Sequence, residues 1–127
     1  MYLWGGRVLD IPKGKSKSIV EFVDLDPTLC EQCGIFQTED SLQGTSFVPV
    51  LENLHAKTKD HVFIQWLGGD NVVDERYSYA QWMQGGRIRA YMLFDHEINP
   101  EENKNRISET VYEQDIDQLA DKVKTHK

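Results

Sequence analysis

Hydrophobic and polar residues alternate most regularly between His61 and Asp95, and this segment predicts the centre of the fold. From Val62 to Leu67 both alternating sets are apolar, which is typical of a strand that is covered on both faces. A second alternating run, Arg87 to Asp95, predicts another strand. Glycine-rich breaks, such as the turn signal from Gly68 to Asn71, separate the apolar runs. We therefore expect strands that are joined by tight turns.

Two further segments carry local signals before and after the central strand. Ser18 to Leu25 is rich in β-branched residues and predicts a strand, and Asp26-Pro27 then suits an N-cap followed by proline at the first helical position. Ser78 and Gln81 have the spacing of a capping box, and Gly85 suits a left-handed C-cap. These last signals predict a short helix from about Tyr79 to Gln84.

The last part of the chain contains one segment with two possible interpretations and one segment with a clear helical pattern. Residues 100–113 could begin as a helix at Asn99-Pro100, but the alternation from Arg106 to Glu113 favours a strand that returns along the strand before it. Residues 114–124 carry one narrow apolar stripe and predict a C-terminal helix. The sum is an α+β fold with a mostly antiparallel sheet of about five strands, in a single domain over residues 1–127.

Charge and composition narrow the function classes. The chain has 127 residues and a net charge of −7, so binding to phosphate backbones is not expected. No apolar run is long enough to cross a bilayer, and the first ten residues lack the pattern of a signal peptide. Two cysteines provide no disulfide framework of the secreted kind. We expect a soluble protein in the cytoplasm, without nucleic-acid or membrane partners.

Aromatic residues gather between His61 and Asp95, and some of them are candidates for ligand binding. Tyrosine and tryptophan combine an apolar body with a polar group, which suits pocket walls and interfaces. The candidates are Trp66, Tyr77, Tyr79, Trp82 and Tyr91. A cationic small molecule or a peptide could be received by such a cluster. Packing in the hydrophobic core and an interface with a second copy are the alternatives.

Arg87 and Arg89 are candidates for holding an anionic ligand. Both are predicted to lie on one face of a strand with Tyr91, where two guanidinium groups could bind an anion together. In an acidic protein the alternative is pairing with local carboxylates.

Cys30 and Cys33 form a C-x-x-C motif that is followed by glycine. Two such thiolates can hold one zinc ion, and His55 and His61 are the nearest candidates for the other two ligands. No second C-x-x-C exists in the sequence. A redox pair is a further alternative, but no cation beside the cysteines would lower their pKa. Two ordinary reduced cysteines are the simplest interpretation, so we expect no cofactor, with zinc as the alternative.

Asp95, His96 and Glu97 follow an apolar strand, where catalytic and metal-binding groups are often found. Successive strand residues point to opposite faces, so Asp95 and His96 are not expected to converge, whereas Asp95 and Glu97 could share a face. The sequence contains no catalytic triad order, P-loop or dinucleotide fingerprint.

No catalytic signature emerges, and the favoured hypothesis is a small binding or interaction module that associates with itself, a dimer being favoured. The aromatic cluster would then line a pocket or a self-association surface. Two alternatives remain from the residues above. One is a small enzyme that uses His96 with Asp95 or Glu97 at the mouth of a pocket. The other is a zinc-stabilised adaptor that uses Cys30 and Cys33 with His55 and His61.

Overall fold

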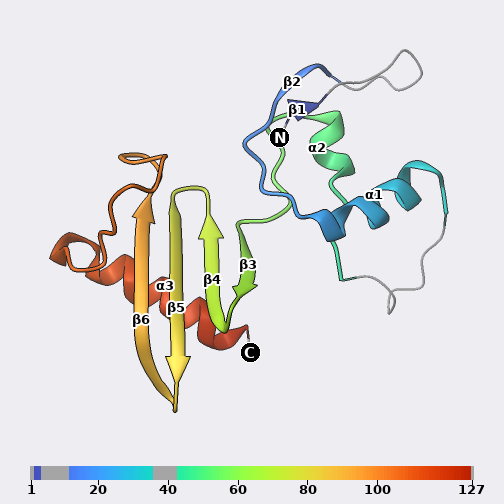
Figure 1. The fold of residues 1–127 in the computed structure, drawn as a ribbon. Helices are drawn as coiled ribbons and strands as arrows, with labels where there is room; N and C mark the ends of the chain where they lie inside the picture. Colours follow the sequence, from blue (N-terminus) through green and yellow to red (C-terminus); the bar gives the residue numbers. More distant parts are fainter. Residues whose placement is uncertain (1, 4–11, 36–42, 127) are drawn as a thin grey trace. The chain divides into compact units, whose positions relative to one another are not determined.

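The computed structural model describes residues 2–3, 12–35 and 43–126, which group into two compact units. Unit 1 comprises residues 1–60 and unit 2 comprises residues 61–127, and both are drawn in Figure 1. Within the described residues no helix has the length and apolar character needed to cross a membrane. The expectation of a single domain stays a prediction.

Unit 2 is built on a four-stranded antiparallel sheet whose spatial order equals the chain order. Its strands are β3 (His61–Trp66), β4 (Gly69–Asp74), β5 (Tyr77–Gln84) and β6 (Arg87–Asp95). Strands that are consecutive in the sequence therefore pair with one another, and short turns connect them. This meander follows from strands that are too close in sequence for crossover connections.

Turn residues explain why the strands reverse where they do. Gly85 and Gly86 both have positive φ angles, of 59° and 77°, at the turn between β5 and β6. Glycine adopts this backbone conformation without a steric penalty, which suits two-residue hairpins. Between β4 and β5 the Asp74 carboxylate instead accepts hydrogen bonds from the backbone N–H groups of Arg76 and Tyr77, at 2.9 and 2.7 Å. A carboxylate at this position stabilises the turn in the same way as a backbone acceptor.

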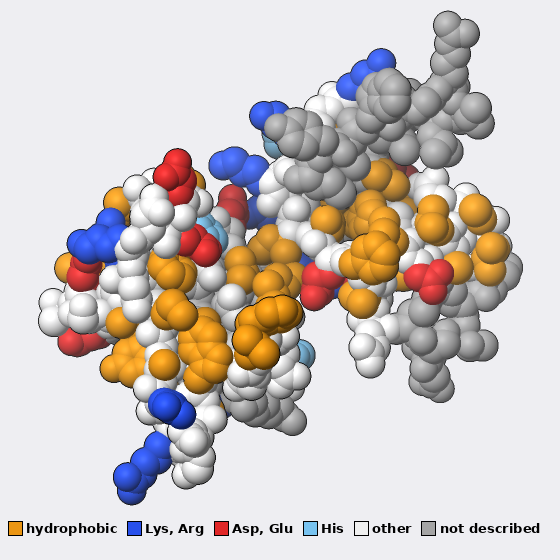
Figure 2. Space-filling view, viewed as in Figure 1, with side chains coloured by type: hydrophobic (Ala, Val, Ile, Leu, Met, Phe, Trp, Pro, Cys, Tyr) orange, Lys and Arg blue, Asp and Glu red, His pale blue; other side chains and the backbone are white. Residues whose placement is uncertain are grey.

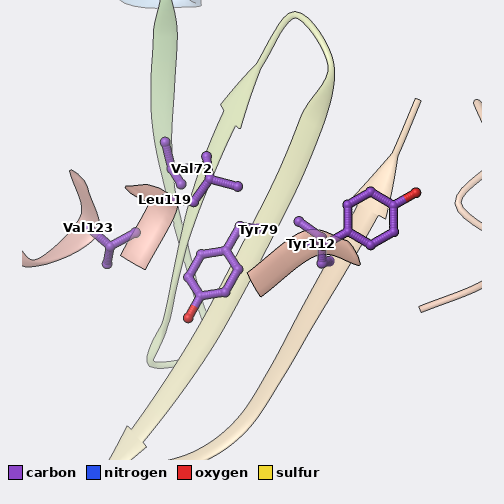
Figure 3. Packing of buried hydrophobic residues seen from close by; sticks show 6 residues of the cluster. Val72, Tyr79, Tyr112, Leu119 and Val123 are labelled. Atoms are coloured by element: carbon purple, nitrogen blue, oxygen red, sulfur yellow. The ribbon is translucent and has the colours of Figure 1, made fainter. Parts of the chain in front are cut away.

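One face of the sheet packs against helix α3 (Glu113–Thr125), which the 3₁₀ turn η2 (Thr110–Tyr112) precedes. In Figure 1 α3 crosses behind the four strands. The core between them combines residues from β4, β5, β6, η2 and α3, most of which Figure 3 labels: Val72, Tyr79, Leu93, Tyr112, Leu119 and Val123. Because Val72, Tyr79 and Leu93 are direct neighbours in the sheet register, they form one continuous row under the helix.

Unit 1 contains short elements and a fully buried acid, Asp24. These elements are β1 (Tyr2–Leu3), β2 (Gly14–Lys15), η1 (Phe22–Asp24), α1 (Leu25–Gln32) and α2 (Val48–Glu52). Asp24 is fully buried, and its carboxylate accepts hydrogen bonds from the backbone N–H groups of Glu21 and Thr45, each at 2.8 Å. The ammonium group of Lys59 lies 2.7 Å from the same carboxylate. Burial alone would raise the pKa of Asp24, but these hydrogen bonds outweigh it and hold the pKa below its usual value.

The α+β class is confirmed, and so is the C-terminal helix, since residues 114–124 lie within α3. The strands expected at Val62–Leu67 and Arg87–Asp95 correspond to β3 and β6. Residues 100–113, for which a helix and a strand were both considered, form neither a long helix nor a strand. They form a loop that ends in η2.

The short helix expected at Tyr79–Gln84 is wrong, because these residues belong to β5. Ser78 and Gln81 do not cap a helix: both are buried in the sheet, where Gln81 accepts a hydrogen bond from the Tyr79 hydroxyl at 3.1 Å. Pairing with β4 on one side and β6 on the other provides hydrogen-bond partners for the backbone N–H and C=O groups of this segment. Tertiary pairing therefore overrides the local capping signal.

The strand expected at Ser18–Leu25 is also wrong, since this segment leads into η1 and then α1. The Asp24 carboxylate and the Glu21 side chain act together here as a reciprocal capping box. Capping of the helical turn by a buried acid outweighs the β propensity of the neighbouring Val20 and Phe22.

Gly44 lies in unit 1 at a position where a side chain would clash with the backbone. We predict that Gly44→Ala lowers the stability of unit 1. An added Cβ would lie 2.0 Å from the Val23 carbonyl oxygen, beside the contact between Thr45 and Asp24. The backbone must shift to relieve this clash, so the free energy of unfolding should fall by about 1–3 kcal/mol. Urea denaturation followed by circular dichroism measures it. The exposed neighbouring variant Gln43→Ala serves as control, and equal stability of both variants would contradict the prediction.

Candidate functional site

Asp95, one of the candidate catalytic residues, is the best-connected acid of unit 2. Its carboxylate is fully buried and lies 2.9 Å from Nη2 of Arg76 and 3.2 Å from the Tyr112 hydroxyl, which donates to it. The backbone N–H of Glu97 donates a third hydrogen bond, at 3.0 Å. Burial alone would raise the pKa of Asp95, but these partners, Arg76 foremost, hold the pKa below its usual value. The group is thus a stable anion with its acceptor positions in use.

His96 does not converge with Asp95, whereas Glu97 contacts the same Arg76 guanidinium as Asp95. Nε2 of His96 lies 2.7 Å from Oε1 of Glu102, whereas Glu97 contacts Nε of Arg76 at 3.2 Å. β6 ends at Asp95, so His96 and Glu97 belong to the turn that follows the strand. His96 lines neither the cavity beside Phe63 and Val123 nor the groove beside Tyr91 and Ile116.

The aromatic candidates are divided between the two faces of the sheet. Tyr77, Tyr79 and Tyr91 lie on the face that carries α3, and Trp66 and Trp82 lie on the opposite face, as the alternation about the Val72–Tyr79–Leu93 row requires. Tyr79 is buried in the core, and its burial raises the pKa of its hydroxyl. The five side chains therefore line no common pocket.

Tyr77 has a structural partner that the sequence did not reveal. Its hydroxyl donates to the Asp115 carboxylate of α3 at 3.0 Å, and the Arg76 guanidinium lies 4.8 Å from the centre of its ring. Burial and the contact with Asp115 raise the pKa of Tyr77 to about 12. This tyrosine therefore ties the start of β5 to the first turn of α3.

A shallow groove lies between the sheet and α3, with a volume of about 530 Å³. Tyr91 and Ile88 of β6 form part of its wall, with Ile116 of α3, and the charged residues at its edge are Glu113, Asp117 and Lys124. Tyr91 is 48% exposed, so it is the one predicted aromatic on this face with a surface open to a ligand. The apolar lining offers contact area for a ligand. The residues that line the groove include no arrangement of a nucleophile beside a general base.

Arg87 and Arg89 are exposed beside the hairpin turn, but they do not form the expected pair on one strand face. The register shifts between Trp82 and Met83, so that Met83 pairs with Ile88 and Trp82 with Ala90, and Arg89 has no opposite residue. A bulge of this kind changes the direction of the side chains around it. Nη1 of Arg89 instead donates to Gln84 across the hairpin, at 2.7 Å.

Cys30 and Cys33 are free thiols at the C-terminal end of α1, and Cys33 is exposed. Throughout residues 2–3, 12–35 and 43–126, no group of three or more His, Cys, Asp or Glu side chains could hold a metal ion. His55 belongs to unit 1 and His61 to unit 2, so the four residues of the predicted zinc site are divided between the units.

Comparison with protein families identifies the chain. Residues 4–127 match the profile of the family described as N-sulphoglucosamine sulphohydrolase, C-terminal. The chain belongs to this family. Membership in this sulphohydrolase family overturns the hypothesis of a binding or self-association module, and with it the small enzyme based on His96 and the zinc-stabilised adaptor. No curated protein matches the chain.

Solved structures share the fold of this chain. The protein BT4656, in complex with its substrate D-glucosamine-2-N,6-O-disulfate, is 19% identical with a TM-score of 0.66, over 81% of this chain and 23% of that chain. BT1596, a 2-O GAG sulfatase, is 24% identical with a TM-score of 0.65, over 81% and 23%. The phosphonate monoester hydrolase of Agrobacterium radiobacter is 21% identical with a TM-score of 0.59, over 80% and 23%.

The chain thus spans about a quarter of the length of these structures. At these identities the likeness shows the fold alone. Self-association, a cationic ligand, a cytoplasmic location and the absence of a cofactor stay predictions.

The buried ion pair predicts how Asp95→Asn affects unit 2. Because the pKa of Asp95 is lowered in the folded protein, the pair stabilises the fold above the ordinary carboxyl pKa of 3.8, and this stabilisation is lost as pH falls through the lowered value. At pH 7 the variant should lose about 2–4 kcal/mol of unfolding free energy, since it removes the charge and leaves Arg76 without its main partner. The loss should shrink below about pH 4.

Urea denaturation followed by the fluorescence of Trp66 and Trp82 measures this loss. Asp121→Asn is the matched control, because Asp121 pairs with Lys124 at 2.8 Å on the exposed surface of α3. This control should leave the stability nearly unchanged. A loss for Asp95→Asn that does not depend on pH would contradict the account.

Proposed function

We propose that the chain serves as the C-terminal part of a sulfatase that removes a sulfate group from a sulfated amino sugar. The observation that carries this proposal is the family match, which extends over residues 4–127. The family is described by an activity on N-sulphoglucosamine, and the substrate bound to BT4656 is a sulfated glucosamine. Both point to the same substrate class.

The contacts of unit 2 are consistent with a supporting role for this part of the protein. Asp95 is satisfied by Arg76, Tyr112 and a backbone N–H, and His96 by Glu102. These residues stabilise the end of β6, and neither Asp95 nor His96 lines the groove between the sheet and α3. We therefore assign the hydrolytic step to a portion of the polypeptide outside this chain, which spans about a quarter of the matched structures.

A second candidate is the hydrolysis of phosphonate monoesters. The phosphonate monoester hydrolase of Agrobacterium radiobacter shares the fold with a TM-score of 0.59. Sulfate esters and phosphonate monoesters both present a tetrahedral, anionic centre, so the fold alone does not separate the two activities.

The test is an activity assay of the polypeptide encoded by the complete reading frame. We expect release of inorganic sulfate from N-sulphoglucosamine or from glucosamine carrying 6-O-sulfate, measured by ion chromatography. An unsulfated glucosamine serves as the blank, and a phosphonate monoester as the competing substrate. Hydrolysis of the phosphonate without release of sulfate would favour the second candidate, and inactivity on all sulfated sugars would refute the first.

A further inference from the structure

The groove of about 530 Å³ between the sheet and α3 is here called the α3 groove. It lies on the side of the sheet that carries the helix, turned away from the hydrophobic side chains that Figure 2 shows over the strands. Its volume falls within the range of sites that bind small molecules. The side chains of its wall and edge therefore define which ligand it takes.

One face of α3 forms one side of the α3 groove. The residues of this face follow the spacing that brings side chains onto one side of a helix: Glu113, Ile116, Asp117, Ala120 and Lys124. The two apolar side chains are half-buried, whereas the three charged side chains are exposed. The helix thus presents charged groups to the groove beside an apolar floor.

The sheet contributes an aromatic ring and an apolar side chain that are open to solvent. Tyr91 is 48% exposed and Ile88 is 44% exposed, and both belong to β6. Tyr79, which is buried, also lines the groove. Burial raises the pKa of Tyr79, and the charges of Tyr91 and Asp117 raise it further. The Asp117 carboxylate therefore lies close enough to the tyrosine side of the groove to act on it.

The two carboxylates of the α3 groove have no partner among the described residues. Neither Glu113 nor Asp117 makes a side-chain hydrogen bond or an ion pair there. Lys124 is held by Asp121 at 2.8 Å and interacts with Asp117 only through its charge. Two carboxylates stand against one ammonium group, so the edge of the groove is net negative. This charge is complementary to a cationic ligand.

The spacing of the two carboxylates gives an independent reason to expect a cation between them. Glu113 and Asp117 are four residues apart, so their side chains are neighbours on the helix surface, and like charges at this spacing destabilise a helix. Glu113 lies in the first turn of α3, where the helix dipole favours an acid. Asp117 lies one turn further, beyond the reach of this effect. A bound cation would relieve the repulsion that α3 itself leaves uncompensated.

We propose that the α3 groove binds a desulfated amino sugar, with its ammonium group beside Glu113 and Asp117 and its ring against Tyr91. This inference rests on the proposed function, because the family is described by an activity on N-sulphoglucosamine. Hydrolysis of the N–S bond consumes one water, whose oxygen goes to sulfur as sulfate is released, while nitrogen becomes an ammonium group. The product therefore carries a positive charge where the substrate carried a negative one. The acidic edge attracts the first and repels the second.

An amino sugar fits the α3 groove better than a lysine side chain of a partner protein does. Its ammonium group is attached directly to a rigid ring, so charge and ring reach the carboxylates and Tyr91 without the ordering of a flexible chain. Its hydroxyl groups are further hydrogen-bond donors to the two carboxylates, whose oxygens accept several such bonds.

Saturation-transfer difference NMR tests the site in the polypeptide encoded by the complete reading frame. D-Glucosamine is titrated, with N-acetylglucosamine as the neutral comparison and glucuronic acid as the anionic one. We expect glucosamine to bind about tenfold more tightly than N-acetylglucosamine, because only glucosamine makes a charge-assisted hydrogen bond to a carboxylate. Glucuronic acid should not compete with glucosamine. Raising the ionic strength should weaken the binding of glucosamine.

Two variants assign the binding to the α3 groove. Asp117→Asn should lower the affinity for glucosamine about tenfold, and Tyr91→Ala should lower it several-fold. Glu101→Gln is the matched control, because Glu101 is an exposed acid that does not line the groove. The unfolding temperature of ligand-free Asp117→Asn should be unchanged or higher, because the repulsion from Glu113 is removed. A loss of affinity in a protein of unchanged stability then reports on the site.

The outcomes separate this inference from the proposed function. Release of sulfate together with equal affinity of wild type and Asp117→Asn for glucosamine would overturn the amino-sugar site and leave the function standing. Binding that depends on Asp117, in a protein that releases no sulfate from any sulfated sugar, would overturn the function and retain the site. Equally tight binding of Nα-acetyl-lysine amide, also dependent on Asp117, would assign the groove to a lysine side chain and overturn the amino sugar as its ligand.

Discussion

The structure of unit 2 depends on the burial of one carboxylate, that of Asp95. A buried anion is stable only if charged or polar partners replace its water, and the partners here come from separate elements. Arg76 approaches from the turn before β5, Tyr112 from η2, and the backbone of Glu97 from the residues just after β6. The requirement to satisfy Asp95 therefore fixes the end of the sheet to the start of the helical segment. It also explains why this acid, although it follows a strand end in the manner of many catalytic residues, supports the fold.

The two faces of the sheet have different roles. One face packs under α3, where Val72, Tyr79 and Leu93 form a continuous row of the core. The other face is apolar but is not covered by α3, and Trp66 stands exposed on it. This asymmetry belongs to a chain of the family described as N-sulphoglucosamine sulphohydrolase, C-terminal.

Some of this organisation could be predicted from the sequence, and the physical reasons for success and failure differ. The apolar run from Val62 to Leu67 predicted a strand, and β3 occupies this position. The expectation that this strand is covered on both faces was wrong, because β3 lies at the edge of the sheet and Ile64 and Trp66 are exposed. The signal at Tyr79–Gln84 misled because a capping box and a C-cap glycine are local patterns, whereas β5 is stabilised by neighbours on both sides. The aromatic residues were correctly placed in one compact region. Their division between two faces depended on the register, which alternation within each strand does not reveal.

By itself the sequence determined the α+β class, the position of β3 and β6, and the amphipathic helix at the C-terminus, because these follow from the spacing of apolar residues along the chain. Only the tertiary structure decided which partners satisfy each polar group. The pairing of Asp95 with Arg76 and Tyr112, the contact between His96 and Glu102, and the exposure of Trp66 all join residues that no local pattern connects. Hydrophobic periodicity is a property of a segment, whereas the satisfaction of a buried charge is a property of the packed fold, so the first can be read along the chain and the second cannot.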